Sequence, residues 1–182
     1  MLNIGEELVA SYLEHIEGCN FIQQNVYTPD VQGEIDVVGI KLKETKSIYV
    51  CEVAIHLTTG LRYVKDKQPN NVNKLFEKFS KDIEYANKYF EDYKKHIMLW
   101  SPIVKGSKAG SKHNQLRDLE ELQVKIHEKY AVELELIVND KFLECLNKLR
   151  SHSKQKTEEL KSPVMRFMQM EEYLKAHVAK GK

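Results

Sequence analysis

Apolar residues recur at helical spacing in several stretches of the chain. The first, residues 3–17, carries one stripe of aliphatic and tyrosine side chains and predicts an amphipathic helix that Gly18 ends. A second stripe in residues 71–90 predicts a longer helix. Shorter patterns predict helices at 114–129 and 139–150.

Runs rich in β-branched and aromatic residues lie between these helices and predict strands. These strands are expected at 21–28, 34–42, 47–57, 96–104 and 131–138. A turn at Pro29–Gly33 and a polar KETK segment bound the second strand, so strands 34–42 and 47–57 are expected to pair as a hairpin. Residues 58–70 read as a polar loop. The order of elements predicts an α/β fold with a central mixed sheet flanked by helices.

The last part of the chain differs in character from the rest. Residues 151–161 are polar, and Ser162 followed by Pro163 marks the start of a C-terminal helix. We therefore expect one α/β domain over residues 1–150, followed by a linker and a helical extension over residues 151–182. A chain of 182 residues is long enough for one domain with a substantial core.

Composition limits the classes of function. Apolar residues make up 42% of the chain and charged residues 30%, while the net charge is only +1, so any surface that binds nucleic acid must be local. The three cysteines show no spacing typical of a zinc site or a disulfide framework, which favours a reducing cytoplasm. Neither a signal peptide nor a run of membrane-spanning length is evident, so we expect no membrane partner.

Three acidic residues occupy positions that indicate metal chemistry. Asp36 and Glu52 lie in the two strands of the expected hairpin, where they can stand side by side. An ionised carboxylate in so apolar a strand as that of Glu52 is unfavourable unless it is paired or binds a metal ion. A divalent cation would relieve the repulsion between the two carboxylates, and oxygen ligands favour Mg²⁺ or Mn²⁺. Glu6, at the edge of the first helical stripe, could add a third carboxylate.

The segments that carry these acids resemble a known family. GEELVASYL, a strand, GEIDVVG and IYVCEV, read in this order over about the first 57 residues, are similar to the PD-(D/E)XK nuclease superfamily. The closest resemblance is to its branch of Holliday-junction-resolvase-like and uncharacterised bacterial nuclease-like proteins. The resemblance implies a restriction-endonuclease-like core.

The same resemblance implies a reaction and its site. It implies a metal-dependent DNA endonuclease that hydrolyses phosphodiester bonds, with Asp36 and Glu52 as the main ligands of Mg²⁺ or Mn²⁺ and Glu6 as an assisting acid. DNA is thus the expected partner, and cleavage of both strands favours a homodimer.

One position departs from the family pattern. The lysine expected two residues after the glutamate is replaced by Ala54. The substitution has three readings: an engineered inactivation, a role moved to His56 or to Lys78 or Lys81 of the next helix, or a natural nuclease-fold protein without activity. We favour the moved role, because alternation would place His56 on the strand face of Glu52.

These readings leave a second class of function open. An inactive protein of the same fold would bind nucleic acid or serve in an assembly without cutting. A third reading, a metal-dependent hydrolase of small molecules, has little support because no nucleotide-binding loop is evident.

A basic loop is the candidate nucleic-acid contact. Lys105, Lys108, Lys112 and Arg117 occur with no acidic residue between them, and the loop leads into a predicted helix N-terminus. Glycines and serines in the loop would let its backbone approach a phosphate group. The alternative is an ordinary exposed loop.

Overall fold

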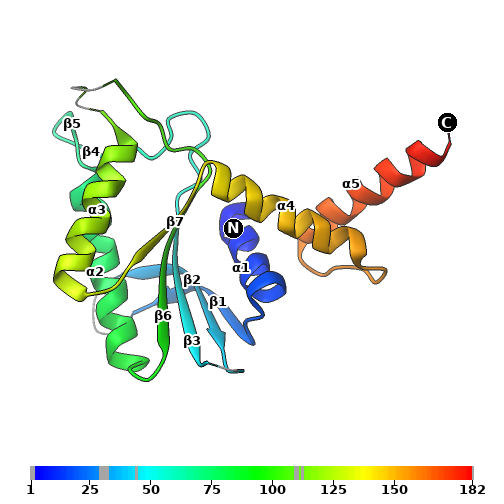
Figure 1. Ribbon diagram of the computed structural model, residues 1–182, viewed down its shortest axis with the longest axis horizontal. Coiled ribbons are helices and arrows are strands. Elements are labelled where there is room, and N and C mark those ends of the chain that lie inside the picture. The colour runs from blue at the N-terminus through cyan, green and yellow to red at the C-terminus, as the bar shows by residue number, and fades with distance from the viewer. Residues whose placement is uncertain (1–2, 29–32, 44, 109–110, 112, 182) are drawn as a thin grey trace.

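A five-stranded sheet forms the centre of the protein. The structure is a computed structural model, and it describes residues 3–28, 33–43, 45–108, 111 and 113–181. The strand order is β1-β2-β3-β6-β7, with antiparallel pairing among the first three strands and parallel pairing among the last three (Figure 1). The strands are β1 (Phe21–Tyr27), β2 (Glu34–Lys41), β3 (Ser47–Val53), β6 (Lys94–Ser101) and β7 (Leu134–Val138). The predicted α/β fold with a mixed sheet is confirmed.

Helices cover both faces of this sheet. On one face lie α2 (Asn71–Tyr89) and α3 (Gln115–Tyr130), and their apolar stripes join one core cluster. On the other face lie α1 (Ile4–Tyr12), its π-helical continuation η1 (Leu13–Glu17) and α4 (Asp140–Gln155), which share a second cluster. Figure 1 shows these two layers on opposite sides of the strands.

The middle strand divides the core by simple alternation. Ile48 and Val50 of β3 belong to the cluster with α2 and α3, whereas Tyr49 and Cys51 belong to the cluster with α1 and α4. This burial on both faces explains why β3 reads as a nearly continuous apolar run. The alternation also assigns Glu52 to the side of α2.

The same strand is shorter than its sequence suggests. The predicted strand 47–57 ends at Val53, because both of its neighbours end there. On one side β2 begins only at Glu34, and on the other β6 ends before Pro102, which has no N–H group for the ladder. The following segment, expected as a plain loop, contains a small hairpin of β4 (Val64–Lys65) and β5 (Gln68–Pro69).

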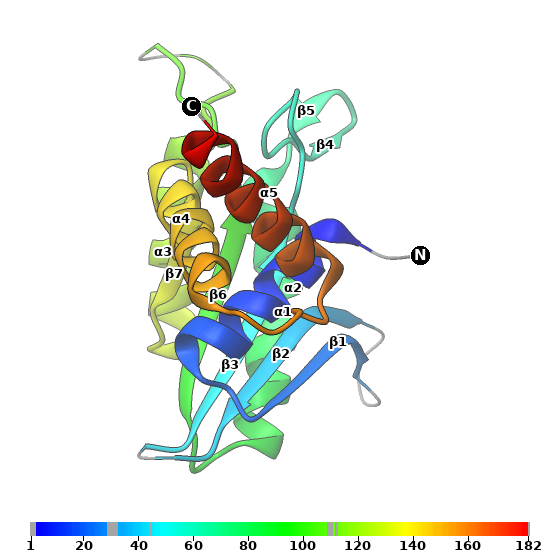
Figure 2. The same ribbon diagram turned by 90° about the vertical axis from the view of Figure 1, so that its right-hand side faces the viewer.

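The C-terminal helix, α5 (Pro163–Lys180), begins as predicted, with the Ser162 hydroxyl accepting a hydrogen bond from the Met165 N–H. Met165 is fully buried in the cluster of α1 and α4, and Figure 2 shows α5 on the side of the sheet that these helices cover. Its last turns extend away from the body (Figure 1). Among the described residues no helix has the length and apolar content needed to cross a membrane.

Candidate active site

Asp36 and Glu52 come together at the end of the β2–β3 ladder. The register pairs Val37 with Cys51, so the next residues along the two strands are the two acids. The Oδ2 atom of Asp36 accepts a hydrogen bond of 2.7 Å from the N–H of Val53, and Glu52 is only 2% exposed. The expected adjacency of the two carboxylates is present in the structure.

A lysine from the facing helix neutralises Glu52. Lys78 of α2 forms an ion pair with the Oε2 atom of Glu52, and its side chain is one-third exposed. Burial alone would lower the pKa of Lys78, but the charges of Glu52 and Asp36 raise it to about 12, so the ammonium group stays charged. Of the basic residues that the sequence offers for this site, the structure pairs Lys78 with Glu52.

The pKa of Glu52 is nevertheless raised, to about 7. Burial is the main cause, the charge of Asp36 adds to it, and the contact with Lys78 opposes it. Its second oxygen, Oε1, is buried and has no hydrogen-bond donor among the described residues. Glu52 is therefore a carboxylate whose negative charge is only partly compensated.

A fourth acid, Asp82, is part of this cluster and was not singled out from the sequence. It lies one turn after Lys78 on α2 and is 3% exposed. Burial first, and then the charge of Glu52, raises the pKa of Asp82 to about 9. Its position in the apolar stripe of Leu75, Phe79 and Ile83 is a signal that sequence reasoning could have used.

Glu6 reaches the cluster from the other side of the sheet edge. It is 7% exposed, and its two carboxylate oxygens accept hydrogen bonds from the amides of Asn3 and Asn25, the latter at 3.1 Å. Burial raises the pKa of Glu6, the amide of Asn25 lowers it, and the charge of Asp36 raises it again. Glu6 is thus within electrostatic reach of Asp36, but both of its oxygens are already engaged.

Local backbone features place Glu6 and its partner. Asn25 has a positive φ of 53° and leaves the β1–β2 register, which skips this residue. Gly5 lets α1 approach the end of β3 closely, since a Cβ atom there would collide with Ile55 and lie 3.1 Å from Val53 Cγ1. Close packing of α1 against the end of β3 therefore explains the glycine that precedes Glu6.

The carboxylate oxygens at this site meet only some of the requirements for binding a hard cation. Asp36 and Glu52 offer carboxylate oxygens, and the buried Oε1 of Glu52 has no protein donor, which is the chemistry that Mg²⁺ or Mn²⁺ accepts. However, no group of three or more acidic, histidine or cysteine side chains in the described part of the chain is arranged to hold a metal ion. Glu6 fits a supporting position better than a direct ligand, because its oxygens are taken by amides.

Two other positions of interest, Ala54 and His56, lie outside the cluster of acids. Ala54 is buried in the core cluster of α2 and α3, and its N–H donates to the carbonyl oxygen of Trp100. His56 is exposed and lies beyond the last residue of β3. The expectation that His56 shares the strand face of Glu52 is wrong, because the chain leaves the sheet before reaching it.

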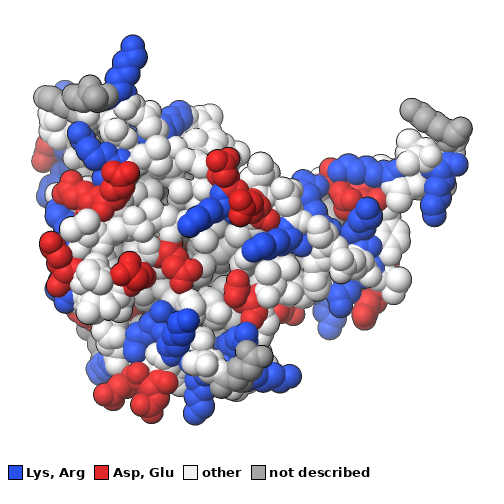
Figure 3. All heavy atoms as spheres, viewed as in Figure 1, with Lys and Arg blue, Asp and Glu red and all other residues white. Residues whose placement is uncertain are grey.

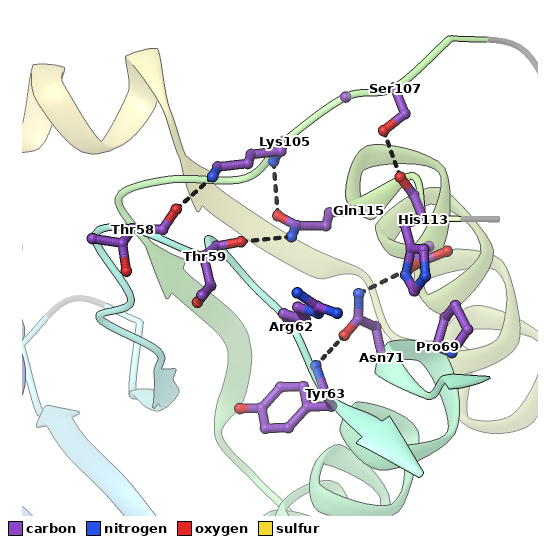
Figure 4. A pocket seen from close by; sticks show the side chains of 12 residues that line it. Thr58, Thr59, Arg62, Tyr63, Pro69, Asn71, Lys105, Ser107, His113 and Gln115 are labelled. Atoms are coloured by element: carbon purple, nitrogen blue, oxygen red, sulfur yellow. Dashed lines mark hydrogen bonds between the residues drawn. The ribbon is translucent and has the colours of Figure 1, made fainter. Parts of the chain in front are cut away.

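A polar pocket opens beyond the ends of β3 and β6 (Figure 4). It has a volume of about 460 Å³. The segment after β3, the loop after β6 and the first turns of α2 and α3 supply its walls, with the residues Thr58, Thr59, Arg62, Tyr63, Pro69, Asn71, Lys105, Gly106, Ser107, His113, Gln115 and Asp118. Burial raises the pKa of the Tyr63 hydroxyl in this lining, and the charge of Lys78 lowers it.

Two buried amides hold the pocket walls in place. Asn71 accepts a hydrogen bond from the Tyr63 N–H and donates to the carbonyl of Leu61 and to the carboxylate of Asp118. Gln115 accepts from the Lys105 N–H and donates to the carbonyl of Thr59, as Figure 4 shows. The segments after β3 and after β6 are thereby fixed to α3.

The residues of the predicted basic loop separate in space. Lys105 lines the pocket, and its ammonium donates to the carbonyl of Thr58. Lys108 and Arg117 are exposed and do not belong to the lining, while Lys112 lies outside the described residues. On the face seen in Figure 3, basic and acidic side chains are interspersed, in keeping with the small net charge.

No protein-family model, no curated protein and no solved structure matches this chain.

Proposed function

We propose that the protein is a metal-dependent DNA endonuclease that hydrolyses phosphodiester bonds at Asp36, Glu52 and Lys78. The observation that carries the proposal is a pair of neighbouring carboxylates, Glu52 buried and Asp36 half-buried, with the ammonium group of Lys78 in direct contact with Glu52 at the open end of the sheet. It agrees with the resemblance of the first 57 residues to the PD-(D/E)XK superfamily. The same segments supply the two carboxylates, and the following helix supplies the cation.

Each residue has a distinct role in this proposal. Asp36 and Glu52 would hold Mg²⁺ or Mn²⁺, and a bound cation of this kind activates water and neutralises charge that develops on phosphate. The hydrogen bond from the Val53 N–H orients Asp36, so that its Oδ1 atom can face the ion. Lys78, charged at every physiological pH, would stabilise the phosphate charge or orient the water in place of the lysine replaced by Ala54. Glu6 would keep its amide contacts and support the negative field at Asp36.

A second function is favoured by one observation. The ammonium of Lys78 already neutralises Glu52 without a metal ion, and both oxygens of Glu6 are engaged. A nuclease-fold protein that had lost its metal site would look like this and would bind nucleic acid without cutting it. The two functions share a fold and differ in whether a divalent cation displaces the Lys78 contact.

Cleavage assays separate the two functions. Linear, circular and branched DNA are incubated with the wild-type protein in Mg²⁺ or Mn²⁺, beside Glu52→Gln and Ala54→Lys variants purified in the same way. The endonuclease proposal expects cleavage by the wild type and none by Glu52→Gln. Cleavage by Ala54→Lys alone would show a disabled but otherwise intact site. DNA binding without cleavage by any of the proteins would favour the second function.

A homodimer belongs to the endonuclease proposal, because cutting both strands of a duplex requires two sites. Sedimentation equilibrium of the protein with and without duplex DNA tests it. We expect a dimer at least in the DNA-bound state, and a strictly monomeric complex that still cuts both strands would contradict it.

A further inference from the structure

The pocket beyond β3 and β6 has the features of a ligand site rather than a gap between loops. It lies beyond the carboxyl ends of the parallel strands β3 and β6, which is where open α/β sheets bind ligands. Its volume of about 460 Å³ falls in the range of pockets that hold one small molecule or one unit of a polymer. Asn71 and Gln115 fix its walls, so the cavity is formed before any ligand arrives.

The pocket lining carries hydrogen-bond donors of the kind that bind an anion. Arg62, Lys105 and His113 contribute cationic or ionisable groups, and Thr58 and Thr59 contribute hydroxyls. Arg62 is exposed and has no ion pair or hydrogen bond with any described residue, so its guanidinium donors are available to a phosphate group. The carboxylate in the lining, Asp118, is buried and accepts a hydrogen bond of 2.8 Å from Asn71, which turns it toward the wall.

The lining also offers surface for a base. Tyr63 presents an aromatic ring and Pro69 an apolar ring at the side of the pocket that adjoins α2 (Figure 4). Stacking of a base on an aromatic side chain requires that the base is not enclosed in a duplex. The combination of a guanidinium with an aromatic wall therefore fits a nucleotide whose base is unpaired.

We propose that this pocket binds an unpaired nucleotide of a DNA strand, with its phosphate at Arg62 and Lys105 and its base beside Tyr63. The placement of this nucleotide next to the cleaved bond rests on the proposed function and on the chain path, because the pocket wall with Thr58 and Tyr63 follows β3, the strand that carries Glu52. The inference narrows the substrate to DNA with an unpaired segment, such as a strand end, a flap or a branch point. It also adds Arg62, which lies outside the basic loop, to the residues that bind the substrate.

Binding measured without metal tests this pocket independently of cleavage. Fluorescence anisotropy in EDTA compares a single strand of about 12 nucleotides, a length that one strand-binding site covers, with a blunt duplex of the same length. Arg62→Gln is the test variant. Lys161→Gln, which also removes one exposed positive charge but lies between α4 and α5, is the matched control. Thermal melting of each variant checks that the fold is retained.

The expected result has three parts. Arg62→Gln weakens single-strand binding roughly tenfold, and the slope of log K against log salt falls by about 0.7, the change for one lost phosphate contact on a single strand. Lys161→Gln changes the affinity by less than about twofold, as for loss of one distant surface charge. The wild type binds the single strand more tightly than the blunt duplex.

Two results would overturn the inference. One is equal effects of Arg62→Gln and Lys161→Gln, and the other is tighter binding of the blunt duplex than of the single strand. Because EDTA prevents metal-dependent cleavage, Arg62-dependent binding supports the pocket even where hydrolysis fails. Conversely, Mg²⁺-dependent cleavage combined with Arg62-independent binding rejects the pocket and keeps the proposed function.

Discussion

Lys78 of α2 places its ammonium group on the carboxylate of Glu52 in β3. The contact joins two residues that are 26 positions apart in the chain. It supplies a positive charge near the place where the family resemblance would put a lysine, at position 54. Ala54 itself is buried in the apolar core. A cation therefore lies beside Glu52 although the residue two positions after it is an alanine.

Replacing Lys78 tests how much its ion pair with Glu52 contributes to the stability of the fold. Lys78→Met leaves the buried Glu52 carboxylate without its cation, so we expect a loss of about 1–3 kcal/mol in the free energy of unfolding at pH 8. Glu52→Gln together with Lys78→Met should lose less than the sum of the single changes, because neither charge then remains unpaired. Urea unfolding of the four proteins gives the coupling, and strictly additive losses would show that the ion pair contributes nothing.

The carboxyl pair of Glu52 and Asp82 predicts a pH dependence of stability. Burial is the main cause of both raised pKa values in the folded protein, about 7 for Glu52 and about 9 for Asp82. The charge of Asp36 adds to the shift of Glu52, and the charge of Glu52 adds to that of Asp82. The folded chain therefore holds protons that the unfolded chain releases near pH 4. The contribution of the pair is complete below that pH and is lost as the pH rises toward 9.

Asp82→Asn is the variant that exposes this dependence. An amide cannot ionise, and it can still donate a hydrogen bond to Glu52, so the variant should lose less stability between pH 5 and pH 9 than the wild type does. We expect a difference of about 1–3 kcal/mol at the alkaline end. Glu77→Gln, an exposed position of the same helix, serves as the control. Identical pH profiles of Asp82→Asn and wild type in urea unfolding would refute the buried carboxyl pair.

The close approach of α1 to the end of β3 predicts a specific rescue. Gly5→Ala introduces a Cβ atom that collides with Ile55, and overpacking of this kind destabilises by about 1–3 kcal/mol. Ile55→Ala removes the atoms that collide and should restore most of the loss. Gly181→Ala, where an added Cβ atom meets nothing closer than 3.8 Å, is the control. If Gly5→Ala melts at the wild-type temperature, the packing reason for this glycine is wrong.

Much of the site follows from alternation and helical spacing in the sequence. The apolar alternation of β3 assigns Glu52 to one face, and the hairpin with β2 places Asp36 beside it. The apolar stripe of α2 puts Lys78 next to the buried side, so the sequence alone makes it a candidate. These features are local, and each depends on a single element or on one hairpin.

The remaining features depend on partners that are distant in the sequence. The end of β3, and with it the exposure of His56, depends on where β2 begins and on Pro102, which follows β6 and lies a whole helix further along the chain. The pocket joins the segment after β3 to the loop after β6 through Asn71 and Gln115, and neither amide stands out from its neighbours in the sequence. Asp82 was overlooked for a different reason, because one acid in an apolar stripe is easily taken for a solvated position.

The rate of DNA cleavage as a function of Mg²⁺ concentration tests the central claim most directly. A branched DNA with a labelled strand is incubated with the wild type, Asp36→Asn and Glu52→Gln, and initial rates are measured before and after addition of EDTA. We predict a rate that saturates with Mg²⁺ in the wild type, is abolished by EDTA, and falls by about 100-fold or more in both variants. Cleavage that persists in Glu52→Gln, or no cleavage at any Mg²⁺ concentration while the DNA stays bound, would contradict the proposed nuclease.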